Sequence, residues 1–358
     1  MAMPTHVVPY DPKFLGGGFS VPLPSLSPAL TKTAYRGGLV LDYVHFSIVL
    51  SQTRKMALYS ACNIDAERKV SGIGRDGVYW RPDERAADAQ LTESVYKKTA
   101  WDHGHLTRRE DVLWGTRSVA RAANEATFYM TNATPQHYRF NQDEWLALED
   151  WVLDIATDLS YKLCVFTGPV LSDKDPLWFP AKRGLDPHTI RVPAAFWKLI
   201  VLRDERAAGN DLAAIAFAMR QTEMWDDDDG AKMMNLKVHQ VPLKTIEKWT
   251  GLSFGSLKNA DELAWSSSRQ QSKKSAAPNE FPVITQKSDL RLNGNERRSQ
   301  GLRVSPTENR TTRALQDQGH ADGNLYEEIA ALRARIDVLE DLAAAQRAKT
   351  AETPHSPA

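Results

Sequence analysis

The stretch that decides the fold is WDHGHLTRREDVLWG at residues 101–115, followed by TFYMTNATPQ at 127–136 and FNQDEWLALED at 140–150. In the first segment two histidines alternate with other residues, and residues two apart on a β-strand project to the same face of the sheet. We therefore expect a strand that carries His103 and His105 on one face. The pattern TFYMTN at the start of the second segment also indicates a strand.

The third segment predicts a helix. Asn141 is followed three residues later by Glu144, which is the spacing of a capping box at a helix start. Apolar residues then recur at helical spacing, at Trp145, Leu148, Val152, Ile155 and Leu159. The sequence thus places Asn141 at the beginning of a helix and Glu149 about two turns inside it.

Short runs dense in apolar and aromatic residues lie on both sides of this stretch and predict the strands of a sheet. They are residues 39–50, 55–64, 162–171, 191–202 and 211–220. A helix is the alternative for residues 211–220, and residues 39–50 could equally open with a helical turn. A further strand and a short helix are expected between residues 237 and 254.

The segment from residue 65 to residue 83 is rich in glycine and polar residues and predicts a loop. It carries four basic residues, Arg68, Lys69, Arg75 and Arg81. Two interpretations are open: a solvated basic loop, or a loop that contacts a phosphate backbone.

Composition divides the chain into parts. Residues 1–34 are rich in Pro, Gly and Ser and predict an extended arm that wraps around another part of the structure. Residues 35–265 have the mixed pattern of a folded domain. Residues 266–322 are polar and poor in aromatic residues, which is typical of a flexible linker. Residues 323–347 predict a coiled-coil helix, and residues 348–358 a disordered tail.

The predicted coiled-coil helix has apolar residues spaced alternately by four and three, at Leu325, Ile329, Leu332, Ile336, Leu339 and Ala343. A lone amphipathic helix that packs on the folded domain is one interpretation. We favour a homo-oligomer formed through this helix, because a polar linker separates it from any core.

The overall composition is that of an ordinary globular protein, with 42% hydrophobic and 25% charged residues, so the chain can bury a sizeable core. The formal net charge is zero at pH 7, and an anionic substrate therefore needs a local basic patch.

Cys62 and Cys164 form no CxxC pair, which favours two reduced thiols, with a single disulfide as the alternative. The chain starts without the pattern of a secretory signal, and no window is apolar enough to span a bilayer. We expect a cytoplasmic protein without membrane contact.

The polar residues of the opening stretch suit hydrolysis of a phosphodiester. A neutral imidazole can take a proton from water near pH 7, which suits His105 or His103 as general base. Magnesium keeps most of its waters and needs few protein ligands, so the amide oxygen of Asn141 can hold it while Glu149 orients a metal-bound water. A zinc site built on His103, His105 and His137 is the alternative.

The chain resembles the DNA/RNA non-specific endonucleases of the ββα-metal class, a family that includes endonuclease G and secreted bacterial nucleases. The resemblance extends over about residues 40–260 and keeps the order of the family's motifs. The strongest matches are DHGHL at 102–106, TFYMTNATPQ at 127–136 and NQDEW at 141–145 with Leu148 and Glu149. Weaker agreement continues at residues 166–170, 192–198 and 250–254.

This resemblance implies an α+β fold, in which a ββα-metal core has a central, mostly antiparallel sheet flanked by helices. It implies that His105 is the general base and that Asn141 binds Mg2+, with Mn2+ as a possible substitute. It also implies that Glu149 orders the waters of the metal and that Asn132 helps to position the site.

Two residues depart from the family pattern. His103 stands where the family usually has arginine, which reduces the positive charge there unless His103 is protonated. Leu153 stands where an arginine commonly follows the helix glutamate. Either Arg108 or Arg109 supplies the missing charge, or the two form a solvated pair beside their acidic neighbours.

The resemblance therefore predicts magnesium-dependent cleavage of DNA, RNA or both, with little sequence preference and with 5′-phosphate ends. The two departures favour an alternative, a catalytically impaired nuclease-fold protein that acts as a nucleic-acid-binding oligomeric scaffold. Because an unspecific nuclease endangers the DNA of its own cell, we also expect control by assembly or by a regulatory partner.

Overall fold

The computed structural model describes residues 8–97, 99–142, 144–158, 162–178, 190–204, 211–221, 238–263, 281, 283, 284 and 290. All of them belong to Met1–Leu302, the first of the two units into which the chain divides. The coiled-coil helix and the tail expected after residue 322 lie outside the described residues, as does most of the expected linker.

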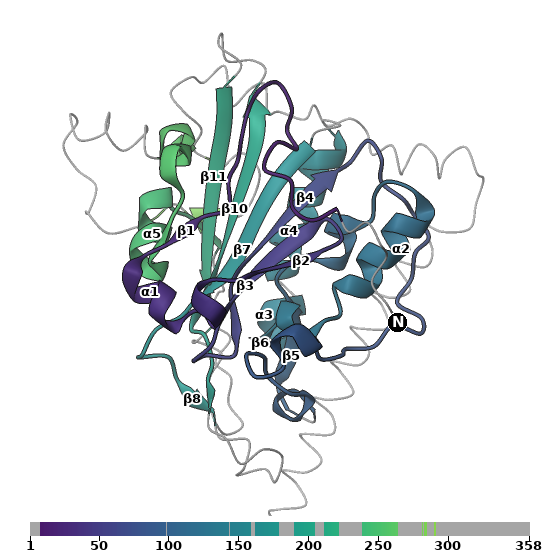
Figure 1. Cartoon of the computed structure of the whole chain (residues 1–358). Helices are drawn as coiled ribbons and strands as arrows, with labels where there is room; N and C mark the ends of the chain where they lie inside the picture. The colour runs from purple at the N-terminus through teal and green to yellow at the C-terminus, as the bar shows by residue number, and fades with distance from the viewer. Residues whose placement is uncertain are drawn as a thin grey trace, which may run out of the picture. The chain divides into compact units, whose positions relative to one another are not determined.

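A large antiparallel sheet forms the centre of the described part of the chain (Figure 1). In the order in which they pair, its strands are β14 (Val283–Ile284), β12 (Val238–Gln240), β11 (Asp211–Arg220), β10 (Ala195–Asp204), β7 (Lys162–Val170), β4 (Met56–Asp65), β3 (Phe46–Ser51) and β2 (Val40–Tyr43). The α+β class and the large antiparallel sheet expected from the sequence are thereby confirmed.

Three small antiparallel pairs accompany the large sheet. They are β1 (Ser25–Leu26) with β13 (Leu252–Ser253), β5 (Trp101–His105) with β6 (Ala133–His137), and β8 (Leu177–Trp178) with β9 (Ile190–Arg191). The α-helices are α1 (Pro28–Thr33), α2 (Arg117–Ala126), α3 (Tyr138–Gln142), α4 (Glu144–Asp158) and α5 (Leu243–Thr250). No described helix has the length and apolar content needed to cross a bilayer.

The large sheet is buried on both faces, which explains why its strands have nearly continuous apolar sequences. Along β10, Phe196 and Ile200 belong to one core cluster, whereas Trp197 and Leu199 belong to another. The first cluster contains the apolar residues of α4, and the second contains those of α5. Figure 1 shows α5 on one side of the sheet and α2, α3 and α4 on the other.

The N-terminal arm packs on the same core cluster as α5. Tyr10, Leu15 and Val21 are buried there, and the Tyr10 hydroxyl donates to the carbonyl of Val21 at 2.7 Å. The arm therefore wraps around the sheet, but it is not extended throughout, because Pro28–Thr33 is helical with Ser27 as its N-cap. Proline near the first helical position fits this start.

Three local expectations need correction. Residues 39–50 form a hairpin of two strands, because His45 adopts a left-handed φ of 70° between them. Residues 127–132 are not a strand and end in the 3-10 turn Met130–Asn132. Within the expected linker, Val283–Ile284 forms β14 beside β12, since this short apolar run can extend the sheet edge.

Candidate active site

The two histidines of the opening stretch lie on a two-stranded hairpin beside the large sheet. In β5 and β6, His103 pairs with Pro135 and His105 pairs with Ala133. Both imidazoles contact Trp80, at ring-centroid distances of 4.8 and 4.5 Å, so they share one face of the strand as the alternation predicted.

Gly104 faces the opposite side of the hairpin. A Cβ atom at this position would collide with the side chain of Gln136, which is fully buried. Neither amide atom of Gln136 has a hydrogen-bond partner in the described part of the chain. Only glycine fits between the two histidines, because any side chain would displace Gln136.

His105 sits in an aromatic and cationic environment. Its ring packs edge-on against Phe128 at 5.1 Å, and its Nε2 is buried without a hydrogen-bond partner among the described residues. Burial, together with the smaller effect of the positive charge of Arg75, lowers the pKa of His105 to about 3. His105 is therefore neutral at pH 7 and can accept a proton.

His103 is held on three sides. Its Nε2 lies 2.9 Å from the carboxylate of Glu93, and its ring stacks on Tyr96 at 3.9 Å as well as on Trp80. Burial lowers the pKa of His103, although the Glu93 carboxylate opposes this shift. His103 thus does not supply the permanent positive charge of an arginine.

Asn141 is the penultimate residue of the short helix α3, which precedes α4. The expectation that Asn141 begins a helix is therefore wrong, because the helical turn already starts at Tyr138. The Nδ2 of Asn141 donates to Asp102 Oδ2 at 3.0 Å, and Gln142 donates to the same oxygen at 2.8 Å. This bond joins α3 to β5 and fixes the amide, whose Oδ1 accepts no hydrogen bond from the described residues. A free amide oxygen is a suitable ligand for a hard divalent cation.

Glu149 lies on α4 within a buried cluster of charged residues. Lys198 of β10 places its Nζ 3.4 Å from Glu149 Oε1 without a hydrogen bond and donates to Thr167 at 2.9 Å. Burial raises the pKa of Glu149, while the charges of Lys198 and Arg108 lower it. In the same cluster, burial raises the pKa of Asp111 to about 7.

Arg108 and Arg109 are not a freely solvated pair. Arg108 binds Glu110 at 3.2 Å and Asp150 at 2.7 Å, while Arg109 donates to the carbonyl of Ile73 at 2.7 Å and pairs with Glu110. The positive charges of both arginines lower the pKa of His105. Both therefore contribute positive potential at His105 even though they are paired.

Arg75 resolves the two interpretations of the basic loop in part. Its guanidinium lies 5.4 Å from the centroid of Phe128, the ring that also contacts His105. Arg68, in contrast, pairs with Asp65 and lies over the ring of Trp114. Arg75 forms no ion pair with the residues that the structure describes and can accept a phosphate.

Asn132 is fully buried, and its side chain forms hydrogen bonds with backbone groups. Its Oδ1 accepts from the Thr107 amide at 2.9 Å, and its Nδ2 donates to the carbonyls of Thr107 at 2.9 Å and Thr127 at 3.0 Å. These bonds explain the turn at residues 130–132. They also fix the segment that follows His105, which is a positioning role.

His137 does not join the other two histidines in a zinc site. It pairs with Trp101 across the hairpin, and its ring contacts that of Tyr138 at a centroid distance of 4.6 Å. Within the described ranges, no group of three His, Cys, Asp or Glu residues is placed to hold a metal ion. The zinc alternative therefore finds no support in the geometry.

Gln221 is a residue of the site that the sequence did not reveal. This buried side chain donates to the carbonyls of Pro135 at 3.1 Å and Pro193 at 2.7 Å, and it accepts from the His137 amide at 2.9 Å. It thereby connects the end of β11 to strand β6 of the histidine-bearing hairpin. The only signal in the sequence was a glutamine directly after an apolar strand.

Replacing Gln221 with leucine is expected to leave two carbonyls and one amide of the hairpin unsatisfied. Each unsatisfied buried group costs about 1–3 kcal/mol, so the free energy of unfolding should fall by about 2 kcal/mol or more. Urea unfolding measures this change. The matched control is Gln52→Leu, whose side chain binds exposed Asp88, and a loss in the control as large as in Gln221→Leu would contradict the bracing role.

Comparison with known proteins identifies the family. Residues 27–261 match the sequence profile of the DNA/RNA non-specific endonucleases. An uncharacterized protein, y4fB, of Sinorhizobium fredii is 37% identical over 52% of this chain, and a nuclease of Nostoc is 28% identical over 49% of it. Human mitochondrial endonuclease G is 24% identical over 63% of this chain and 70% of its own length.

The aligned region spans 29% of the Sinorhizobium protein and 58% of the Nostoc nuclease, so both relatives extend well beyond it. A solved structure of the EndoG/EndoGI complex is 20% identical and gives a TM-score of 0.45 over 63% of this chain and 89% of that one. The family match covers well over half of the chain and includes every residue of the hairpin and of α4. This chain belongs to the DNA/RNA non-specific endonuclease family.

Proposed function

We propose that this chain is a magnesium-dependent endonuclease that hydrolyses phosphodiester bonds of DNA, RNA or both and leaves 5′-phosphate ends. The observation that carries the proposal is the state of His105, whose buried Nε2 has no described hydrogen-bond partner and whose pKa is lowered to about 3. Such an imidazole is unprotonated at neutral pH, which is the state that a general base needs.

The other side chains provide what hydrolysis of a phosphodiester needs besides a base. Among the described residues, the amide oxygen of Asn141 accepts no hydrogen bond, and neither does the buried Oε1 of Glu149. These donors fit the divalent metal of the family, with Asn141 as its ligand and Glu149 orienting a metal-bound water. When bound, magnesium stabilises the negative charge that develops on the phosphate and the leaving oxygen.

The chain's own cations bind and orient the substrate. Arg75 lies on the same aromatic ring as His105 and is free to pair with a phosphate oxygen. Arg108 and Arg109 add positive potential around the base. Asn132 and Gln221 hold the backbone on which His105 is mounted.

The alternative, an inactive scaffold, rests on His103 and Leu153. Leu153 of α4 is buried in the core cluster that also contains residues of α2, so no cation is present at that position. Lys198, however, approaches Glu149 from β10 and supplies a positive charge from another element. The positive charge of Lys198 at this place favours an active enzyme. Assembly through the C-terminal helix and control by a regulatory partner remain predictions.

Removing the metal or its ligand is expected to stop cleavage. Purified protein should nick supercoiled plasmid in the presence of magnesium, and a chelator should abolish the reaction. Asn141→Ala should lower the cleavage rate by about 100-fold or more, because outer-shell partners alone already change metal affinity or activity by about 10–100-fold.

The control for that variant is Asn259→Ala, which removes an exposed amide from the turn Gly255–Ala260. It should cleave at the wild-type rate. Wild-type protein that leaves plasmid and RNA intact at every magnesium and manganese concentration would instead support the scaffold alternative.

The pH profile offers a second test of the base. Because the pKa of His105 in the folded protein is about 3, this group stays unprotonated as the pH falls through 6.5, the ordinary histidine value. The acid limb of kcat/KM should therefore not show a histidine pKa near 6.5. If kcat/KM of the wild type instead falls with a single pKa of about 6.5, and His103→Gln does not show this fall, the titrating group is His103.

A further inference from the structure

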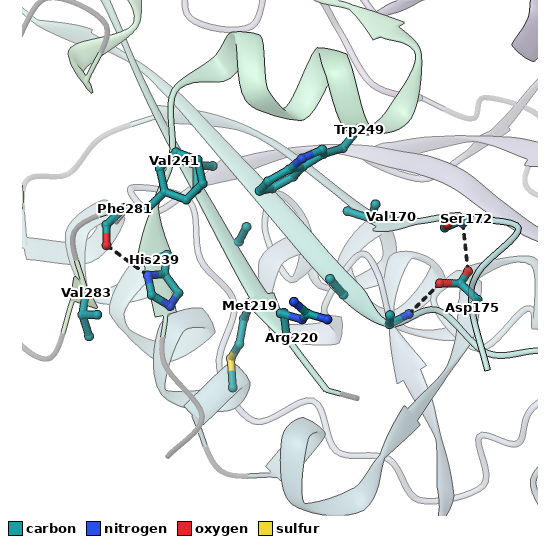
Figure 2. A pocket seen from close by; sticks show the side chains of 13 residues that line it. Val170, Ser172, Asp175, Met219, Arg220, His239, Val241, Trp249, Phe281 and Val283 are labelled. Carbon is teal, nitrogen blue, oxygen red and sulfur yellow. Dashed lines mark hydrogen bonds between the residues drawn. The ribbon is translucent and has the colours of Figure 1, made fainter. Parts of the chain in front are cut away.

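A cavity of about 550 Å³ lies at one end of the large sheet, where β7, β10, β11 and β12 meet α5 (Figure 2). No residue with a role in the proposed hydrolysis lines it. Its volume falls in the range of about 300–1,000 Å³ that is usual for small-molecule pockets. The proposed hydrolysis therefore does not use this cavity.

The walls of the cavity are mainly apolar. Ala218 and Met219 of β11 line it together with Val241. The indole of Trp249 reaches toward the space from α5 (Figure 2). Trp249 also contacts the ring of Phe281 edge-on at 6.0 Å. The exposed indole of Trp249 and the partly buried ring of Phe281 provide contact area for an apolar molecule.

The polar residues of the cavity leave one charge unpaired. Asp175 is neutralised, because its carboxylate accepts from Arg54 at 2.6 Å and from the amides of Ser172 at 2.9 Å and Ala194 at 3.1 Å. Arg220 also lines the cavity, and its guanidinium pairs with no group in the part of the chain that the structure describes. The cavity thus combines an apolar interior with a single available cation.

We propose that this cavity binds a small apolar molecule that carries one carboxylate, with Arg220 pairing with the carboxylate and Trp249 covering the apolar body. A guanidinium matches a carboxylate with two parallel hydrogen bonds. A ligand with several negative charges is disfavoured, because Arg220 is the one unpaired cation among the described lining residues and most of the other lining residues are apolar.

The binding test uses 8-anilinonaphthalene-1-sulfonate as the fluorescent probe, since it is apolar and carries one anionic group. The probe should bind the full-length protein at one saturable site. Decanoate and 2-naphthoate are the two competitors, one aliphatic and one aromatic, and at least one should displace the probe. The uncharged analogue of each, decanol or 2-naphthol, should displace it about tenfold less well.

Two variants test whether the probe and the acids bind in this cavity. Arg220→Gln removes the cation from an exposed position. In this variant, the acid that displaces the probe from the wild type should bind about tenfold more weakly. Ala218→Phe fills the cavity and should abolish probe binding. The matched control is Arg121→Gln on the exposed face of α2, which should bind as the wild type does.

The proposal is overturned if Arg220→Gln binds the acids as tightly as the wild type. It is also overturned if the wild type shows no saturable binding, which is the result expected when a segment of this chain or a second copy fills the cavity. Neither readout requires cleavage of nucleic acid, so the outcome is independent of the proposed nuclease activity.

Discussion

Replacing His105 with alanine is expected to lower the rate of plasmid cleavage by about 100-fold to 10,000-fold, the usual contribution of a general base. His105 is the imidazole whose Nε2 is buried and without a hydrogen-bond partner in the described residues, and its lowered pKa keeps it neutral. Initial rates of nicking at saturating magnesium measure the loss. Circular dichroism and urea unfolding show whether the variant is folded.

The matched control for this prediction is His137→Ala. His137 stands on the same hairpin but contacts Trp101 and Tyr138, and its removal should leave the cleavage rate within a few-fold of the wild type. Full activity in His105→Ala would end the assignment of the base. Equal loss in both variants, together with bound zinc in the purified protein, would revive the zinc site.

The local pattern of the sequence predicted the parts of the fold that depend on periodicity. Alternation placed both histidines on one face of β5, and the long apolar runs at residues 162–171 and 211–220 became β7 and β11. The strand was also preferred to the helix for residues 211–220, and that choice is confirmed. These predictions succeed because residues close in sequence determine period and burial together.

The predictions that were wrong or could not be made concern features that depend on contacts between distant segments. Residues 127–132 have strand-like composition, but Asn132 bonds to Thr107 and Thr127 and bends the chain into a turn. Whether Arg75 or Arg68 faces the histidines could not be read from a loop that contains both. Pairing with Asp65 and stacking on Trp114 occupy Arg68, and only the folded chain shows this.

Lys198 is a different case, because the sequence did contain a signal. A lysine within the apolar run FWKLIVL must either interrupt the strand or be buried with a partner. The alternation along β10 puts Lys198 on the face of Phe196 and Ile200, which is the face covered by α4. Its partner Glu149 could then be expected from α4 once the strand and the helix were assigned to the same layer.

Replacing Lys198 with methionine is expected to lower the free energy of unfolding by about 3–5 kcal/mol, the cost of removing one partner of a buried ion pair. Lys198 is 1% exposed, and without it Glu149 keeps its charge only beside Arg108, with Asp111 in the same cluster. Urea unfolding at pH 7 measures the loss. The control is Lys162→Met, at an exposed position of β7.

A double variant separates the ion pair from loss of packing. Adding Glu149→Gln to Lys198→Met removes the unpaired carboxylate, so the double variant should be more stable than Lys198→Met alone. The single variant should also show a shifted pH dependence. Loss of the Lys198 charge raises the pKa of Glu149 further, so a larger share of its carboxylate is protonated at pH 7 and cleavage should recover as the pH is raised. If cleavage by Lys198→Met stays equally low at every pH and the double variant is no more stable than the single one, Lys198 acts only by filling space beside Trp145.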